Sequence, residues 1–172
     1  MFFHYIKQIF ICLFFIYPLA CLCHSSQENQ NSWNADKYIE HSQVDQKFSQ
    51  FLLQEIHLKG NEKVLDIGCG DGRISLELAK KVPQGKVIGV EPSPSMINKA
   101  KSLHQSTDLQ NISFVQGNAE TFAINQKFDI VIAIHVMHWI KDQNQALQNI
   151  YAHLAPNGKV YFMMAPSKED LP

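Results

Sequence analysis

The stretch that decides the fold is Val64-Leu65-Asp66-Ile67-Gly68-Cys69-Gly70-Asp71-Gly72. Its first residues form a short apolar run typical of a buried strand, and glycines then alternate at 68, 70 and 72. Glycine adopts backbone dihedral angles that other residues avoid, and it lets a ligand lie directly against the main chain. A helix expected after the glycines, through about Lys81, would present free N–H groups to a ligand carboxylate. The stretch therefore predicts a strand, a ligand-binding loop and a helix.

Glu91 ends the next predicted strand, which begins at Lys86, and lies about twenty residues beyond the loop. A carboxylate at this place can hold both ribose hydroxyls of an adenosine. Nicotinamide-dependent enzymes have the pattern G-x-G-x-x-G, in which the third glycine comes one position later than it does here. The observed spacing disfavours a nicotinamide cofactor. A tight turn that binds no ligand is the remaining alternative.

Helix and strand patterns alternate along the rest of the chain. The spacing of apolar residues predicts a helix over 42–57, and Ser93-Pro94 has the N-cap and first residue of another helix. Asp142 is the expected N-cap of a later helix, and Pro156-Asn157-Gly158 is an expected turn. Further strands are expected over 111–115, 128–134 and 159–164. This order predicts an α/β fold, a Rossmann-like doubly wound parallel sheet of five strands.

Composition limits the kinds of partner. The chain has 172 residues and a net charge of −1, with no basic run, so we expect one domain, a small-molecule substrate and no nucleic acid. Cys69 is the one cysteine beyond residue 23, which leaves a disulfide framework unsupported. His135 and His138 have no Glu or Cys beside them to complete a metal site, so no metal is expected.

An apolar leader precedes the globular part. Residues 1–24 carry one lysine and then an uncharged run, which is typical of a signal peptide, with a membrane anchor as the second choice. Residues 25–32 are a polar linker, and residues 33–172 are the globular domain. We therefore expect export or anchoring, with membrane contact through the leader. If the start is misassigned, the protein is cytoplasmic.

The glycine run, with Asp66 two residues before its first glycine, resembles the first motif of class I S-adenosylmethionine-dependent methyltransferases. The resemblance covers nearly everything from Trp33 onward and implies S-adenosyl-L-methionine as the cofactor. The residues that it assigns to the cofactor in this first part are Asp66, Gly68, Cys69, Gly70, Gly72 and Glu91. Residues 116–120 resemble the segment that contacts adenine, which adds Asn118 and Ala119. Many members have Asp at position 118, and either side chain can bond the adenine amino group.

The run His135-Val136-Met137-His138-Trp139-Ile140 resembles the "LHW" segment of trans-aconitate and juvenile-hormone-acid methyltransferases. This implies His135 at the cofactor and places His138 and Trp139 in the substrate pocket. Trp33 and Tyr38 resemble the N-terminal cover that these proteins fold across the cofactor. No catalytic residue is assigned: His138 is a pocket wall or a base, and Trp139 lines the pocket or packs in the core.

The activity implied by the resemblance is methyl transfer to a small molecule. A carboxylate acceptor is already ionised and needs no general base. Class I methyltransferases usually have seven strands, and the chain ends just after the fifth predicted one, so we expect the two C-terminal strands to be missing and the fifth strand to be an exposed edge. The alternative is an inactive, truncated methyltransferase that binds cofactor, or a module completed by a partner protein.

Overall fold

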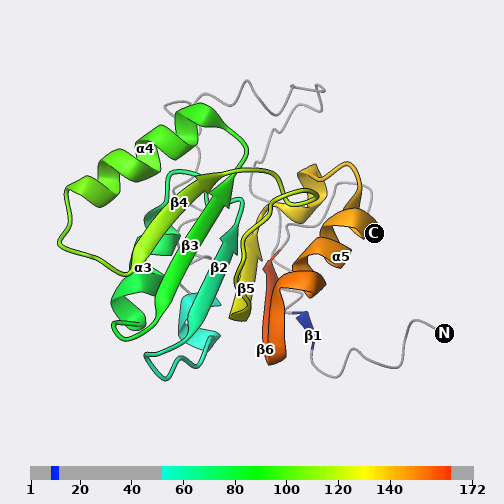
Figure 1. Cartoon of the computed structure of the whole chain (residues 1–172), viewed down its shortest axis with the longest axis horizontal. Helices are drawn as coiled ribbons and strands as arrows, with labels where there is room; N and C mark the ends of the chain where they lie inside the picture. The colour runs from blue at the N-terminus through cyan, green and yellow to red at the C-terminus, as the bar shows by residue number, and fades with distance from the viewer. Residues whose placement is uncertain (1–8, 12–51, 164–172) are drawn as a thin grey trace, which may run out of the picture.

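The computed structural model describes residues 9–11 and 52–163, which form one parallel sheet with helices on both faces (Figure 1). The predicted residues Trp33 and Tyr38, the linker 25–32 and most of the helix expected over 42–57 lie outside the described residues; residues 52–55 are helical. The strands are β1 (Ile9–Ile11), β2 (Lys63–Ile67), β3 (Lys86–Glu91), β4 (Ile112–Gln116), β5 (Phe128–Ile134) and β6 (Leu154–Met163). The helices are α3 (Arg73–Lys81), α4 (Pro94–Gln105), the short 3₁₀ helix η2 (Met137–Trp139) and α5 (Gln143–His153).

The sheet order is β1-β6-β5-β2-β3-β4. From β2 the chain moves outward through β3 to β4, and it then returns to the other side of β2 to form β5 and β6. The order in which strands are added to the sheet therefore changes side between β2 and β5. In open α/β sheets, ligands bind at such a point, beyond the carboxyl ends of the strands. The predicted Rossmann-like fold and its five strands are confirmed.

Two of the predicted helix caps form as expected. The Ser93 side chain accepts a hydrogen bond from the main-chain N–H of Met96 at 3.5 Å, and Pro94 is the first residue of α4. Asp142 accepts one from the N–H of Gln145 at 2.9 Å at the start of α5. Each cap satisfies a main-chain donor that the helix itself leaves unpaired, which fixes where the helix begins.

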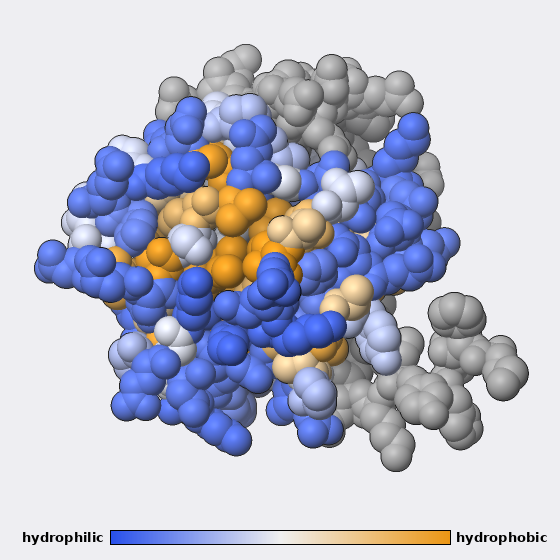
Figure 2. All heavy atoms as spheres, viewed as in Figure 1, coloured by the Kyte–Doolittle hydropathy of each residue, from blue (hydrophilic) through white to orange (hydrophobic). Residues whose placement is uncertain are grey.

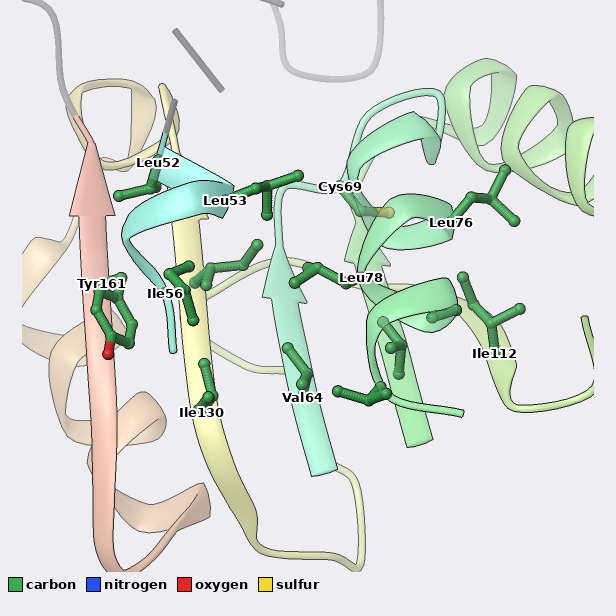
Figure 3. Packing of buried hydrophobic residues seen from close by; sticks show 14 of the residues in the cluster. Leu52, Leu53, Ile56, Val64, Cys69, Leu76, Leu78, Ile112, Ile130 and Tyr161 are labelled. Carbon is green, nitrogen blue, oxygen red and sulfur yellow. The ribbon is translucent and has the colours of Figure 1, made fainter. Parts of the chain in front are cut away.

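The core has one apolar cluster on each face of the sheet. Figure 3 shows the cluster under α3, where Leu52 and Ile56 lie over β5 and β6 near Ile130 and Tyr161. The cluster on the other face joins the sheet to α5 through Ala146 and Ile150. β5 contributes to both clusters, as expected for a strand that is buried on both faces.

The face shown in Figure 2 has an apolar area near its centre, surrounded by hydrophilic residues. On β4, Ile112 and Phe114 belong to the cluster under α3, so the alternation of a strand turns Val115 toward the opposite face, where it is 38% exposed. No helix of the described residues is long and apolar enough to cross a membrane.

β6 differs from its prediction at its start. We expected a turn at Pro156-Asn157-Gly158 and a strand from Lys159, but the strand begins at Leu154 and contains the turn as a bulge. Its pairing with β5 advances from Phe128↔Leu154 to Ile130↔Lys159, so β6 uses more residues than β5 over this step. Asn157 takes a φ of 63°, in the left-handed region that asparagine tolerates. The turn residues were identified correctly, but they bend a strand instead of preceding one.

The edge beside β6 also differs from the expectation. β1 pairs with β6 in parallel, in the register Ile9↔Val160, Phe10↔Tyr161 and Ile11↔Phe162. Three residues of the predicted leader therefore extend the sheet, and β6 is not its outermost strand. The rest of the leader lies outside the described residues.

Candidate functional site

Asp66 lies in the centre of the sheet, on β2 between Gly89 of β3 and Ile132 of β5. The Ser75 hydroxyl on α3 donates a hydrogen bond of 2.5 Å to Asp66 Oδ2, and both side chains are buried. The pKa of Asp66 is raised to about 7, because burial raises it, the Ser75 hydrogen bond opposes the rise in part, and the charge of Glu91 adds to it. A buried carboxylate with a raised pKa at the end of β2, next to the glycine loop, is typical of a functional site.

Glu91 is held at the end of β3 by two main-chain donors. The N–H of Gly70 donates to Oε2 at 3.1 Å and the N–H of Ser93 donates to Oε1 at 3.0 Å. Burial raises the pKa of this carboxyl, and the two hydrogen bonds oppose the rise. The predicted glycine loop and the predicted acid are therefore in direct contact. Within the described part of the chain, neither Glu91 nor Asp66 forms an ion pair, so their charges can complement a cationic ligand.

The three loop glycines have positive φ angles of 68°, 54° and 82° at positions 68, 70 and 72, but their surroundings differ. A Cβ on Gly68 would lie 2.2 Å from Val136 Cγ2, and one on Gly72 would lie 2.8 Å from Ala100 Cβ. These two glycines are required by packing inside the protein. A Cβ on Gly70 would meet only Met96 Cε, at 3.4 Å, which is an ordinary van der Waals contact, so Gly70 is the loop glycine beside which packing leaves room.

The Cys69 side chain belongs to the core and not to the ligand side of the loop. It is 8% exposed and lies in the cluster under α3 (Figure 3). Burial raises the pKa of its thiol well above the ordinary value, with the charges of Asp66, Glu91 and Asp71 adding to the rise. Its N–H donates to the Val90 carbonyl and its carbonyl accepts from the Gly72 N–H. The Cys69 side chain thus packs in the core, and the cofactor contact that the resemblance implies stays a prediction for its main chain.

Residues 117–127, here called the 117–127 segment, connect β4 to β5 beside Glu91. The N–H of Gly117 donates to the Glu91 carbonyl at 3.1 Å, which joins this segment to the end of β3. Asn118 Oδ1 accepts from the Thr121 N–H at 2.9 Å and from the Thr121 hydroxyl at 2.6 Å. The predicted adenine-contacting Asn118 and Ala119 therefore lie next to the predicted ribose-binding acid.

Residues that the sequence analysis missed hold this segment in place. Asn149 Nδ2 on α5 donates to the carbonyls of Ala119 at 3.1 Å and Phe122 at 3.0 Å. His153 Nε2 accepts from the Ile124 N–H at 3.3 Å. A signal was present, because Asn149 follows the buried Ala146 by three positions and so lies on the inner stripe of α5.

His135, His138 and Trp139 follow β5 at the same end of the sheet. His135 has a φ of 55°, and its N–H donates to the Met163 carbonyl at 2.8 Å, so the chain turns sharply here. The rings of His138 and Trp139 lie 5.1 Å apart, and Trp139 is 46% exposed. Exposure of this kind disfavours core packing for Trp139. The described residues contain no group of three or more His, Cys, Asp or Glu that could hold a metal ion.

The family follows from a match over most of the chain. Residues 58–172 match the family described as "Methyltransferase domain". The chain belongs to this methyltransferase domain family. The G-x-G-x-G spacing, which resembles the first motif of S-adenosylmethionine-dependent methyltransferases, agrees with this family.

Two curated relatives that the chain resembles are both named as methyltransferases. The malonyl-[acyl-carrier protein] O-methyltransferase 1 of Ilyobacter polytropus is 30% identical over 138 residues, covering 78% of this chain and 50% of that protein. The trans-aconitate 2-methyltransferase of Deinococcus radiodurans is 28% identical over 139 residues, covering 81% and 51%. The chain spans about half the length of these curated relatives.

A solved structure supports the fold. A SAM-dependent methyltransferase from Aquifex aeolicus superposes with a TM-score of 0.64 at 21% identity, over 72% of this chain and 69% of that one.

Proposed function

We propose that this methyltransferase domain binds S-adenosylmethionine beside Asp66, Gly70 and Glu91 and transfers its methyl group to the carboxylate of a small molecule or of a carried acyl group. The observation that carries the proposal is the Glu91 carboxylate, which the Gly70 and Ser93 N–H groups hold at the carboxyl end of β3. A carboxylate fixed in this way beside an open glycine suits the two hydroxyls of a ribose.

The residues that would hold the cofactor have separable tasks. Glu91 would accept hydrogen bonds from the ribose, and Asp66 would complement the positive charge of the cofactor. Asn118 would contact the adenine, and its Oδ1 is already engaged by Thr121, which leaves its Nδ2 as the donor to a ring nitrogen. This refines the expectation that Asn118 would accept from the adenine amino group.

The cofactor supplies a methyl group on a cationic sulfur, which a nucleophile can attack in line. With the cofactor held by Asp66, Gly70 and Glu91, the displacement would break the bond from the methyl carbon to sulfur as the bond to the acceptor oxygen formed, and it would leave a neutral thioether. The protein contributes mainly position and exclusion of water. A carboxylate acceptor is ionised at neutral pH, so no base is required and His138 serves as a wall of the pocket.

The names of the two curated relatives support a carboxylate acceptor, because trans-aconitate is a carboxylic acid and malonyl carries a free carboxyl group. The first test is calorimetric titration of the purified full chain with S-adenosylhomocysteine, with NAD as the control ligand. Saturable binding of S-adenosylhomocysteine alone is expected at one site. A folded chain that binds neither ligand would contradict the proposal. Transfer of labelled methyl to trans-aconitate or a malonyl thioester then tests the acceptor class.

For localisation we propose that residues 1–24 direct the chain to or across a membrane. Fractionation of cells that express the full chain and a chain beginning at residue 25 tests this. Equal distribution of the two chains between membrane and soluble fractions would contradict it.

A further inference from the structure

The hydrogen bond between Ser75 and Asp66 is the shortest link in the site, at 2.5 Å from Ser75 Oγ to Asp66 Oδ2. Ser75 is 0% exposed and lies in the first turn of α3, directly behind the glycine loop. No other described residue bonds the Asp66 carboxylate. Ser75 therefore occupies one carboxylate oxygen, and the other accepts no hydrogen bond from the described residues.

The surroundings of Asp66 contain acids and no cation that pairs with it. From β3 the charge of Glu91 acts on it, and from the loop the Cys69 thiol lies near it. On α3, Arg73 is paired with Asp71 at 3.0 Å. On β5 its register partner is the uncharged Ile132, and His135 follows the end of that strand. An ionised Asp66 is thus buried beside a second acid, Glu91, which is costly without a hydrogen-bond donor.

We propose that Ser75 is a positioning residue of the cofactor site, whose hydroxyl aims the Asp66 carboxylate and keeps it ionised to receive a cationic group of S-adenosylmethionine. This inference rests on the function proposed above. The donor stabilises the ionised form of Asp66 relative to the protonated form, since a carboxylate accepts the bond and a buried acid without it retains its proton. The serine thereby sets the pH range in which the site binds its cofactor.

The effect of removing the Ser75 hydroxyl on cofactor binding depends on the direction in which the pKa of Asp66 is shifted. The pKa of Asp66 is raised to about 7, mainly by burial, and the Ser75 hydrogen bond opposes the rise. Removing the hydroxyl raises the pKa further, so at neutral pH a larger fraction of Asp66 is protonated and cannot receive a cation. At alkaline pH the Asp66 carboxylate is ionised in both wild type and Ser75→Ala, and the difference in cofactor affinity between them disappears.

The experiment is calorimetric titration of the full chain and of Ser75→Ala with S-adenosylmethionine and S-adenosylhomocysteine, from pH 6.5 to pH 9. The ratio of variant to wild-type Kd is the readout, because the titration of the ligand itself cancels in the ratio. At pH 6.5 we expect the Kd of Ser75→Ala to exceed that of wild type by a factor of about ten or more, since each unit added to the pKa of Asp66 changes the ratio about tenfold. At pH 9 we expect the ratio to be about two or less.

Two further variants separate positioning from structure. Ser75→Thr keeps a hydroxyl and is expected to keep the ratio near one across the range. Ile150→Val, a buried substitution on the opposite face, loses packing alone and is expected to give a ratio that does not change with pH. If Ser75→Ala does not fold, Asp66→Asn replaces it, and the wild-type Kd is expected to depend more steeply on pH than the Kd of Asp66→Asn.

The outcomes distinguish the two proposals. A wild-type chain that binds cofactor, with a Ser75→Ala ratio constant in pH or equal to that of Ile150→Val, would overturn the role of Ser75 alone. If Asp66→Asn is used in place of Ser75→Ala, an equal pH dependence of the Kd of wild type and of Asp66→Asn would also overturn the role of Ser75. A folded wild-type chain that binds neither ligand would overturn the proposed function and this inference with it.

Discussion

In the glycine-loop half of the site, main-chain N–H groups of Gly70 and Ser93 hold a carboxylate, whereas in the 117–127 segment side chains hold the main chain. There Thr121 bonds Asn118, and Asn149 bonds the carbonyls of Ala119 and Phe122. The first half is built by residues close to its own strands and loop. The second depends on a helix that the chain reaches about thirty residues later, within the usual span of a βαβ unit. Damage to the first half should therefore abolish binding, and damage to the second should loosen it.

The largest expected effect is from Gly70→Val. Valine at a φ of 54° is strained, and its side chain would fill the open space beside Gly70. We expect the affinity for S-adenosylhomocysteine to fall by about a hundredfold or more, equivalent to about 2.7 kcal/mol, in calorimetry. Gly60→Val is the matched control, since it also has a positive φ, of 100°, but lies away from the site. Equal loss of affinity in both variants would show that strain, and not occupied space, is responsible.

Glu91→Ala should have the next largest effect. It removes the carboxylate that would accept the ribose hydroxyls, and bonds to a charged group contribute about 1.5–3 kcal/mol. Calorimetry should show a loss of about ten- to a hundredfold in affinity. Glu91→Gln keeps one acceptor oxygen and should lie between wild type and Glu91→Ala. An affinity unchanged by Glu91→Ala would remove the carboxylate from the binding site.

Asn149→Ala tests the second half. It leaves the Ala119 and Phe122 carbonyls without their donor, which costs about 1–3 kcal/mol where such groups are buried. We expect faster hydrogen exchange over the 117–127 segment and an affinity loss of about three- to tenfold, equivalent to at most about 1.4 kcal/mol. The control is Asn144→Ala, an exposed position on the same helix. A loss as large as that of Glu91→Ala would mean that the two halves do not differ as described.

Trp139→Ala should have the smallest effect on the fold. The side chain is 46% exposed, so the free energy of unfolding should change by about 0.5 kcal/mol or less. Cofactor affinity should be unchanged, and KM for the methyl acceptor should rise if Trp139 lines the substrate pocket. Tyr151→Ala, which is 63% exposed on α5, should change neither quantity. A fall in thermal stability for Trp139→Ala alone would assign the ring to packing.

The contrast between the halves also explains what could be predicted from the sequence. The placement of the loop, Asp66 and Glu91 could be predicted because all three fall within one strand–loop–helix–strand unit with fixed spacing, and their roles toward a cofactor stay a prediction. The sequence could place Asn149 on the inner stripe of α5, but the partners of Asn149 and Thr121 could not be predicted. They are main-chain carbonyls and a neighbouring side chain that no spacing rule specifies. The resemblance implies Cys69 at the cofactor, but spacing does not predict that its thiol packs into the core, so any contact with cofactor is left to its main chain. The bulge in β6 was missed because Pro156-Asn157-Gly158 is equally typical of a turn between elements.

The two hydrogen bonds to Glu91 have a consequence for the thermodynamics of association. Both carboxylate oxygens are held before any ligand arrives, so no rotamer freedom remains to be lost at this residue when a ribose binds. Each oxygen retains a second lone pair, so the ligand adds to these bonds without displacing them. The conformational entropy of the Glu91 side chain is lost when the chain folds and not when the ligand binds. Its hydrogen bonds with the ligand therefore contribute to affinity without that entropic cost.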